Sequence, residues 1–181
     1  GGERAALFAT DPPYLVDYDG TNLPQGWNNP KPSMNKDWSE SYKDWDAATQ
    51  GAELYDGFIA TAIEHAIVEN AAWYCWHASR RQAMLEEVWE RHGAFVHQQI
   101  IWAKDRPVLT RSFYMWQHEP CFFGWIRGKK PKRAVDEWLS SVWSFPTQTA
   151  FERTDHPTQK PLALFEIPMR QHTEVGEVVY E

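Results

Sequence analysis

Short apolar runs alternate along this chain with segments in which apolar residues recur at helical spacing. The apolar runs and the turn residues beside them predict strands over residues 5–10, 71–77, 95–104, 119–127, 141–145 and 177–180. Helical spacing predicts helices over residues 51–69, 79–91 and 160–172. Strands that alternate with helices indicate an α/β sheet, and an antiparallel pair is expected late in the strand order.

Polar residues, glycine and proline set the predicted ends of these elements. Asp11-Pro12-Pro13 should end the first strand in a loop, because proline cannot donate to a sheet ladder. Ser79 can cap the second helix, and His92-Gly93 can close it. Thr158 can cap the third helix, whose start is expected near Lys160.

Residues 15–50 interrupt the alternation. They are polar, rich in Pro, Asn, Asp and Trp, and without a sustained period, which predicts a long functional loop. For any single aromatic side chain of this loop, packing back onto the core is favoured: Trp27, Trp38, Tyr42 and Trp45. No repeat or low-complexity linker divides the chain, so residues 1–181 are predicted to form a single domain.

The composition is that of a packed domain, with 43% hydrophobic and 15% aromatic residues. No apolar run approaches the roughly 18 residues that a membrane span needs, and the first residues lack the pattern of a signal peptide. We therefore expect a soluble cytoplasmic protein. Cys75 and Cys121 lie in apolar stretches without metal-ligand spacing, which favours buried free thiols over a disulfide or a ligand pair. The seven histidines are scattered, so a metal or hydrolytic enzyme is disfavoured.

The net charge of −7 argues against a nucleic-acid partner, because phosphate binding gains from Lys and Arg. The charges are unevenly distributed, however, and acidic residues crowd positions 37–70. A basic run follows much later: Arg127, Lys129, Lys130, Lys132 and Arg133. This run could serve a DNA groove or be a solvated loop, and the sequence leaves both interpretations open.

Asp11-Pro12-Pro13-Tyr14 stands where an open α/β sheet binds its ligands, at the carboxyl end of a strand. Methylation of an exocyclic amine needs an acceptor for the amino group and a flat surface for a base taken out of the duplex. Asp11 and the Pro12 carbonyl can supply the acceptors, and Tyr14 can stack on the base. The rigid prolines would fix these groups relative to one another. The alternative is an Asp-Pro turn followed by a buried tyrosine.

A second motif, HPTQKP, occupies residues 156–161. Besides the cap offered by Thr158, the start of a helix attracts anions, and Lys160 adds a full positive charge. This segment could therefore bind an anionic group or serve only as a structural cap.

The order of these two motifs resembles the β group of DNA amino-methyltransferases, in which DPPY comes early and HPTQKP late. Between the motifs the chain is similar to the family at residues 71–77, at IIWAKD (100–105), and at His118-Glu119 leading into CFFGWIRG (121–128). The resemblance implies a Rossmann-like fold of S-adenosylmethionine-dependent methyltransferases, with a mixed sheet and helices on both faces. Essentially the whole chain is covered.

The resemblance also implies an activity and its residues. S-adenosylmethionine would be the cofactor, and the exocyclic amine of a flipped base in double-stranded DNA would be the methyl acceptor, in a direct transfer without a metal. Asp11, Pro12, Pro13 and Tyr14 would form the catalytic motif, and Thr158, Lys160 and Asp11 would lie at the cofactor. Residues 15–50 would close over target and cofactor, where the aromatic side chains of Trp27, Trp38, Tyr42 and Trp45 could meet bases or backbone. Residues 105–155 would contain the DNA-recognition loops, with candidate contacts at Arg106, Arg111, Tyr114, Lys129 and Lys130. His77 and Ser79 also fall at the carboxyl end of a predicted strand, where one of them could line the pocket, although a hydrogen-bonded core histidine is the commoner case.

Two alternatives follow from the same family. Asp at the first motif position leans towards adenine N6, but cytosine N4 stays open. In the family a glycine-rich cofactor loop follows a strand such as GEVVYE, and no comparable run occurs among the ten glycines of this chain. We therefore expect a fragment that ends before this loop and is inactive alone, with a non-catalytic DNA-binding remnant as the other reading. A cognate endonuclease, a phage source and a homodimer are all left open by the sequence.

Overall fold

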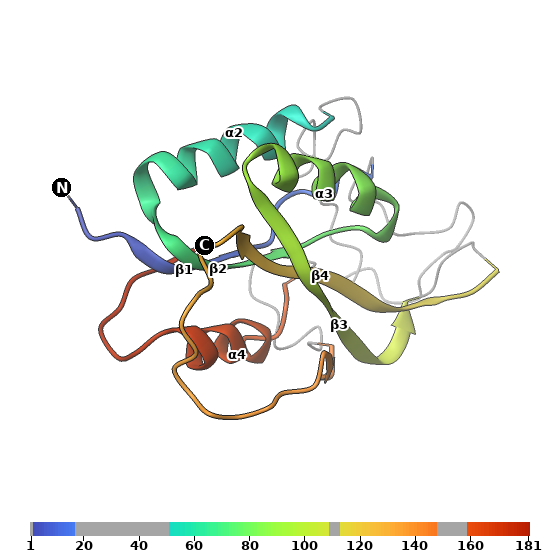
Figure 1. Ribbon diagram of the computed structural model, residues 1–181. Coiled ribbons are helices and arrows are strands. Elements are labelled where there is room, and N and C mark those ends of the chain that lie inside the picture. Colours follow the sequence, from blue (N-terminus) through green and yellow to red (C-terminus); the bar gives the residue numbers. More distant parts are fainter. Residues whose placement is uncertain (1, 17–50, 109–112, 148–158) are drawn as a thin grey trace, which may run out of the picture.

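One mixed sheet organises the computed structural model, which describes residues 2–16, 51–108, 113–147 and 159–181 (Figure 1). The six described strands lie in the order β5-β3-β4-β2-β1-β6. Their bounds are Ala5–Thr10 (β1), Ile67–Trp76 (β2), Ala94–Val108 (β3), Trp116–Ile126 (β4), Val142–Ser144 (β5) and Val179–Tyr180 (β6). Strand β1 is parallel to β2 and β6, and β5 is parallel to β3, whereas β4 is antiparallel to both β2 and β3. All strands except β4 therefore share a carboxyl edge.

Helices cover both faces of the sheet. Helices α2 (Glu53–Thr61) and α3 (Gln82–Arg91) lie on one face and α4 (Ala163–His172) lies on the other, as Figure 1 shows. Helix α2 continues into a π-helical turn, η3 (Ala62–Ala66), and α3 is preceded by a 3₁₀ turn, η4 (Ser79–Arg81). The predicted fold class, a Rossmann-like mixed sheet with helices on both faces, is confirmed.

Alternation along the strands builds the two halves of the core. In β1, Phe8 packs with the residues of α2 and α3, while Leu7 and Ala9 pack on the α4 side. Because successive side chains of a strand point to opposite faces, a wholly apolar strand fits a sheet that is buried on both sides. Trp73 of β2 illustrates the packing, since its ring meets the rings of Phe8 and Trp89 edge-on at centroid distances of 5.4 and 5.5 Å.

Gly124 of β4 marks a close approach of two strands. A Cβ atom at this position would lie 1.9 Å from the carbonyl oxygen of Phe95 in β3. The β3–β4 register shifts here, between Val96 and Gln98. Only glycine leaves room for the neighbouring backbone at this bulge.

The predicted elements are all present, with shifted boundaries. The first helix ends at Ala66 instead of residue 69, because Ile67 is buried and already pairs with Ala5 as the start of β2. Strand β3 runs to Val108 and β4 starts at Trp116, so the irregular connection is shorter than predicted. Gly93 has a φ of 75° just beyond α3, which agrees with its expected role in closing that helix.

Two predicted helix caps are wrong. Ser79 lies inside the 3₁₀ turn, whose N-cap is Ala78, and neither η4 nor α3 has a side-chain cap. Helix α4 begins at Ala163, and its N-cap position is occupied by Leu162 instead of the predicted Thr158. Pro161 explains the later start, because a residue before proline is disfavoured in helical conformation and Lys160 therefore stays outside the helix. Thr158 itself lies outside the described residues.

The expectation of free thiols is confirmed, since Cys75 and Cys121 are both buried and unpaired by a disulfide. Among the described residues, no helix has the length and apolarity needed to cross a membrane. The same part of the chain holds no cluster of three or more His, Cys, Asp or Glu side chains that could bind a metal ion.

Candidate active site

The DPPY segment follows β1 directly at the carboxyl edge of the sheet, as predicted. Hydrogen bonds from α2 and η4 hold this segment in place. The Tyr55 hydroxyl in α2 donates to the Pro13 carbonyl at 2.7 Å, and Arg81 Nε donates to the Leu15 carbonyl at 2.8 Å. Leu15 is fully buried and has a φ of 53°, which turns the chain away from the sheet. The backbone that carries Asp11 and Tyr14 is therefore held from two sides.

Lys160 connects this segment to the rest of the site. Its side chain is only 5% exposed, and Nζ lies 2.6 Å from Oδ1 of Asp11 and 3.2 Å from Oε2 of Glu119. The ammonium group also lies 5.0 Å from the centre of the Tyr14 ring and 5.4 Å from that of Trp76. Burial alone would lower the pKa of Lys160, but the carboxylates of Asp11 and Glu119 outweigh it and raise the pKa. Lys160 is therefore a fixed cation and not a base.

Glu119 is the second centre of the cluster. Its Oε1 accepts from Lys104 at 2.6 Å, while Oε2 accepts from the Tyr14 hydroxyl at 2.9 Å and faces Lys160. Burial alone would raise the pKa of Glu119, but the two lysine charges and the hydrogen bonds lower it to about 2. The pKa of Tyr14 is raised, first by burial and then by Asp11 and Glu119, so its hydroxyl remains a donor. Four alternating charges thus line the carboxyl edge: Asp11, Lys160, Glu119 and Lys104.

The strand register explains how distant residues meet. Trp102 of β3 pairs with Glu119 of β4, and Trp102 packs on the α4 side of the sheet. Lys104 is two residues beyond Trp102 and so shares that face. Because β1 ends at Thr10 opposite Cys75, and Trp76 pairs with Cys121, the hairpin of β3 and β4 extends past the end of β1. Its overhanging part carries Glu119 and Lys104 toward Asp11 and Tyr14.

Of the predicted site residues, the structure brings together Asp11, Tyr14 and Lys160. It adds Glu119 and Lys104, which were not among the predicted site residues. A signal for them does exist in the sequence, because each is a charged residue two positions from an apolar, inward-facing residue of its strand, Trp102 for Lys104 and Cys121 for Glu119. That signal becomes readable only once the register of β3 against β4 is known.

The predicted DNA contacts are spread over the molecule. Arg106 lies near the end of β3 on the carboxyl side, where its Nε donates to Thr147 Oγ1 at 3.1 Å, and Tyr114 is 87% exposed in the connection between β3 and β4. Lys129 and Lys130 follow β4 at the opposite edge of the sheet, and Lys129 pairs with Glu69 at 2.8 Å. Arg111 lies outside the described residues, as does most of the predicted closing loop. The DNA-binding roles of these residues stay predictions.

His77 is a core residue at the end of β2. Its ring is fully buried against Phe122, with centroids 4.2 Å apart, and Nδ1 lies 3.2 Å from the Ala78 carbonyl. Burial lowers the pKa of His77 to about 4, so the ring is neutral at physiological pH. Ser79, two residues later, starts the 3₁₀ turn η4.

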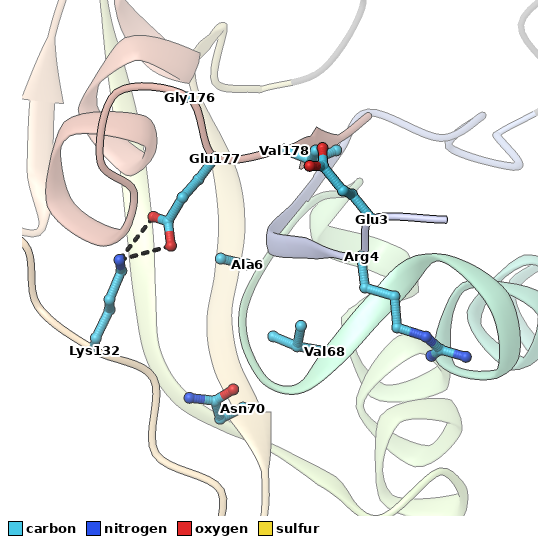
Figure 2. Close-up of a pocket in the computed structure, with 9 residues that line it drawn as sticks. All are labelled: Glu3, Arg4, Ala6, Val68, Asn70, Lys132, Gly176, Glu177 and Val178. Carbon is cyan, nitrogen blue, oxygen red and sulfur yellow. Dashed lines mark hydrogen bonds and ion pairs between the residues drawn. The ribbon is translucent and has the colours of Figure 1, made fainter. Parts of the chain in front are cut away.

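A cavity of about 380 Å³ lies at the other end of the sheet, where β1 begins (Figure 2). The two cationic side chains that line it, Arg4 and Lys132, are already bound to groups of this chain. Arg4 donates to the carbonyls of Ile63 and Ile67 at 3.1 and 3.0 Å, and Lys132 is paired with Glu177 at 2.7 Å, as Figure 2 shows. The cavity is also remote from Asp11. The cluster at the carboxyl edge is therefore the candidate active site.

Comparisons with known proteins identify structures of the same fold. No protein-family model matches the chain, and no curated protein matches it. Among solved structures, the M1.HpyAVI–SAM complex has a TM-score of 0.61 at 20% identity and covers 98% of this chain and 71% of its own. A second M1.HpyAVI structure has a TM-score of 0.56 at 17% identity, with 98% and 69% covered. PvuII DNA methyltransferase, described as cytosine-N4-specific, has a TM-score of 0.63 at 11% identity, with 98% and 66% covered. The chain therefore shares the fold of these proteins and spans roughly two thirds of their length.

Proposed function

We propose that this chain is the catalytic part of an S-adenosylmethionine-dependent methyltransferase that modifies the exocyclic amine of a base in double-stranded DNA. The fold shared with PvuII DNA methyltransferase and M1.HpyAVI supports the class of enzyme. The order of DPPY and HPTQKP along the chain supports the family. One observation carries the proposal, namely the arrangement of the Asp11 carboxylate beside the Tyr14 ring at the carboxyl end of β1.

Asp11 is prepared to accept a hydrogen bond from an amine. Lys160 holds Oδ1 at 2.6 Å, whereas Oδ2 has no hydrogen bond or ion pair with any other described residue. The side chain is 30% exposed, so a substrate can reach it. An amine that donates one hydrogen to Oδ2 keeps its lone pair directed away from the carboxylate, and the Pro12 carbonyl is a second candidate acceptor.

Tyr14 suits the base itself. Its hydroxyl is bound by Glu119, and one side of the ring meets Lys160, so the ring has a fixed orientation. A flipped base is gripped by stacking on such a ring and by hydrogen bonds along its edge. The pair of prolines between Asp11 and Tyr14 limits the freedom of the backbone that joins acceptor and ring.

The cofactor would bind at the same edge, between β1 and β6. Strand β2 lies on one side of β1, and β6 lies on the other, so the strand order reverses at β1. Open α/β sheets bind ligands at such a reversal. An ammonium group has three donors, so Lys160 can offer one to a cofactor carboxylate besides those given to Asp11 and Glu119. Thr158 is the other candidate from the HPTQKP motif. When bound, S-adenosylmethionine supplies the methyl group, and the amine loses one proton, which the Asp11 carboxylate can accept.

Adenine N6 is the favoured target, because Asp stands at the first position of the motif. Cytosine N4 is the second candidate, because the PvuII enzyme, described as cytosine-N4-specific, shares the fold of this chain. Both targets are exocyclic amines, and both need a hydrogen-bond acceptor such as Asp11 and an aromatic ring such as Tyr14 on which the base can stack.

The test is methyl transfer by the natural protein that contains this chain, using labelled S-adenosylmethionine and unmethylated genomic DNA. Hydrolysis of the DNA to nucleosides should show the label in N6-methyladenine, and label in N4-methylcytosine would select the second candidate. Asp11→Ala should lower turnover by at least ~100-fold, because the acceptor is lost. Asp56→Ala, which breaks a pair with Arg91 on α3, is the matched control and should stay active. Near-normal turnover of Asp11→Ala would contradict the proposal, and DNA binding without any transfer would favour a non-catalytic remnant.

A further inference from the structure

We propose that Glu119 is the positioning residue of the base site, fixing Tyr14 and Lys160 with a single carboxylate. The inference rests on the proposed function and deepens it. Glu119 acts on the substrate through Tyr14 and Lys160, the two residues that lie beside it. It comes from β4, far along the chain from both the DPPY segment and the HPTQKP segment.

The contacts divide between the two carboxylate oxygens. Oε2 accepts the Tyr14 hydroxyl at 2.9 Å and lies 3.2 Å from Lys160, while Oε1 is bound by Lys104 at 2.6 Å. Lys104 holds the other oxygen of the carboxylate, so Glu119 cannot turn away without losing an ion pair. Each of the three partners comes from a different part of the chain, which makes Glu119 the point where they are joined.

The first consequence concerns the aromatic platform. A tyrosine side chain can rotate about its Cα–Cβ bond, and a hydrogen bond at its hydroxyl group restricts that rotation. For Tyr14 the hydrogen-bond acceptor is Glu119. A small rotation of the ring would displace a stacked base relative to Asp11, and misplacement of about 1 Å can cost on the order of 100-fold in rate.

The second consequence concerns the charge beside Asp11. Lys160 is shared between Asp11 at 2.6 Å and Glu119 at 3.2 Å. Without the negative charge of Glu119, the ammonium group would bind Asp11 alone and weaken it as an acceptor for the amine. Glu119 therefore maintains both the geometry and the charge balance of the site.

A buried cluster of this kind is not explained by stability alone. Taking carboxylates and ammonium groups out of water is costly, and well-packed apolar residues of similar volume often stabilise a protein as well or better. The neighbouring positions on the same face, Trp102 and Cys121, show that this part of the hairpin accommodates apolar side chains. The charges are instead placed where a substrate amine needs a fixed acceptor.

The experiment uses the natural protein that contains this chain and compares Glu119→Gln, Tyr14→Phe and the double variant with the parent. Turnover is measured on unmethylated genomic DNA, with kcat and the KM for S-adenosylmethionine determined separately. Glu119→Gln keeps the size of the side chain, and Tyr14→Phe removes only the hydroxyl. Glu90→Gln is the matched control. Glu90 lies on α3, is exposed, pairs with Arg127 and is remote from the site.

We expect Glu119→Gln to lower kcat by about 10- to 100-fold with less than about a threefold change in the KM for the cofactor. Tyr14→Phe should lower kcat by about three- to tenfold, and the double variant should lose less than the product of the two, because both changes break the same contact. Glu90→Gln should match the parent.

Several outcomes would overturn the inference. A normal kcat for Glu119→Gln, or two effects that simply multiply, would make Glu119 a structural residue only. If Glu119→Gln does not fold, a normal kcat for Tyr14→Phe would have the same meaning. A parent protein that transfers no methyl group would instead refute the proposed function, so the two failures can be told apart.

Discussion

Ion pairs stand at both ends of the same sheet, but they differ in their exposure to water. At the carboxyl edge the side chains of Lys160 and Lys104 are 5% and 9% exposed, and both bind Glu119. At the amino edge Lys132 is 38% exposed and binds Glu174 and Glu177, the first of which is 73% exposed. The residue types and the N–O distances of the two groups are similar. What separates them is the solvent around each group.

This difference decides what each group can do. Exposed ion pairs contribute about 0–1 kcal/mol, because water screens them and long side chains lose entropy in pairing. A buried group holds its atoms in one geometry, since no water can replace a missing partner. The amino edge is therefore a solvated surface, whereas the carboxyl edge is a preorganised site.

Removing one cation from each edge should give the largest contrast. Lys160→Met removes a buried ammonium group and leaves Asp11 and Glu119 without the partner they share, which should cost about 3–5 kcal/mol of the free energy of unfolding. Lys132→Met breaks exposed pairs only and should cost less than about 1 kcal/mol. Urea unfolding of the two variants measures both values. Equal losses would mean that the carboxyl edge is solvated like the amino edge.

Acidification should reveal a second buried group at the carboxyl edge. The folded pKa of His77, about 4, lies below the ordinary value of 6.5, so the unfolded chain takes up a proton that the folded protein does not. Stability should therefore fall as the pH drops from 6.5 to 4, by on the order of 3 kcal/mol for this residue. His172 acts in the same direction, because burial also lowers its pKa.

The contribution of His77 is isolated by comparing urea unfolding of the parent and of His77→Phe across this pH range. The variant should show the shallower loss. His65→Phe is the matched control, since the His65 side chain is 66% exposed and remains in water in the folded protein. Parallel curves for the parent and His77→Phe would contradict the prediction.

Much of the fold follows from local sequence pattern. The apolar run 5–10 and the two prolines after it are sufficient to predict β1 and a loop at its carboxyl end, because these signals lie within a few residues of one another. The position of Asp11 and Tyr14 at the carboxyl end of β1 is predictable for that reason. The resemblance assigned both Lys160 and Asp11 to the cofactor, but their direct contact is visible only in three dimensions.

The missed features depend on relations between distant segments. Glu119 and Lys104 could not be assigned to the site, because their position depends on how far β3 and β4 extend past β1 and on the pairing of Trp102 with Glu119. Helix α4 starts three residues later than predicted, because Pro161 disfavours a helical conformation at Lys160. Sequence pattern thus predicts elements better than the register that brings their side chains together.

The pH dependence of Glu119 gives a smaller effect at the same edge. Its folded pKa of about 2 lies below the ordinary value of 4.5, so its contribution to stability is complete above pH 4.5 and is lost as the pH falls toward 2. The part lost by pH 3 should be about 2 kcal/mol. Glu119→Gln starts from a lower stability, because two lysines lose their partner, but it should change less between pH 5 and 3. Urea unfolding at both pH values tests this, and an equal change in parent and variant would show that Glu119 titrates alike in the folded and unfolded protein.

The amino edge should give the smallest effect. Glu177→Gln removes a carboxylate that lies 2.7 Å from Lys132, yet Lys132 keeps Glu174 as a partner and both remain in contact with water. The expected loss in the free energy of unfolding is therefore below about 1 kcal/mol, and 1 M salt should abolish most of it because exposed pairs are screened. Urea unfolding at low and high salt measures both parts. A larger loss that persists in salt would show that the cavity between β1 and the segment before β6 shields the pair from solvent, and the two edges would then differ in function without differing in solvation.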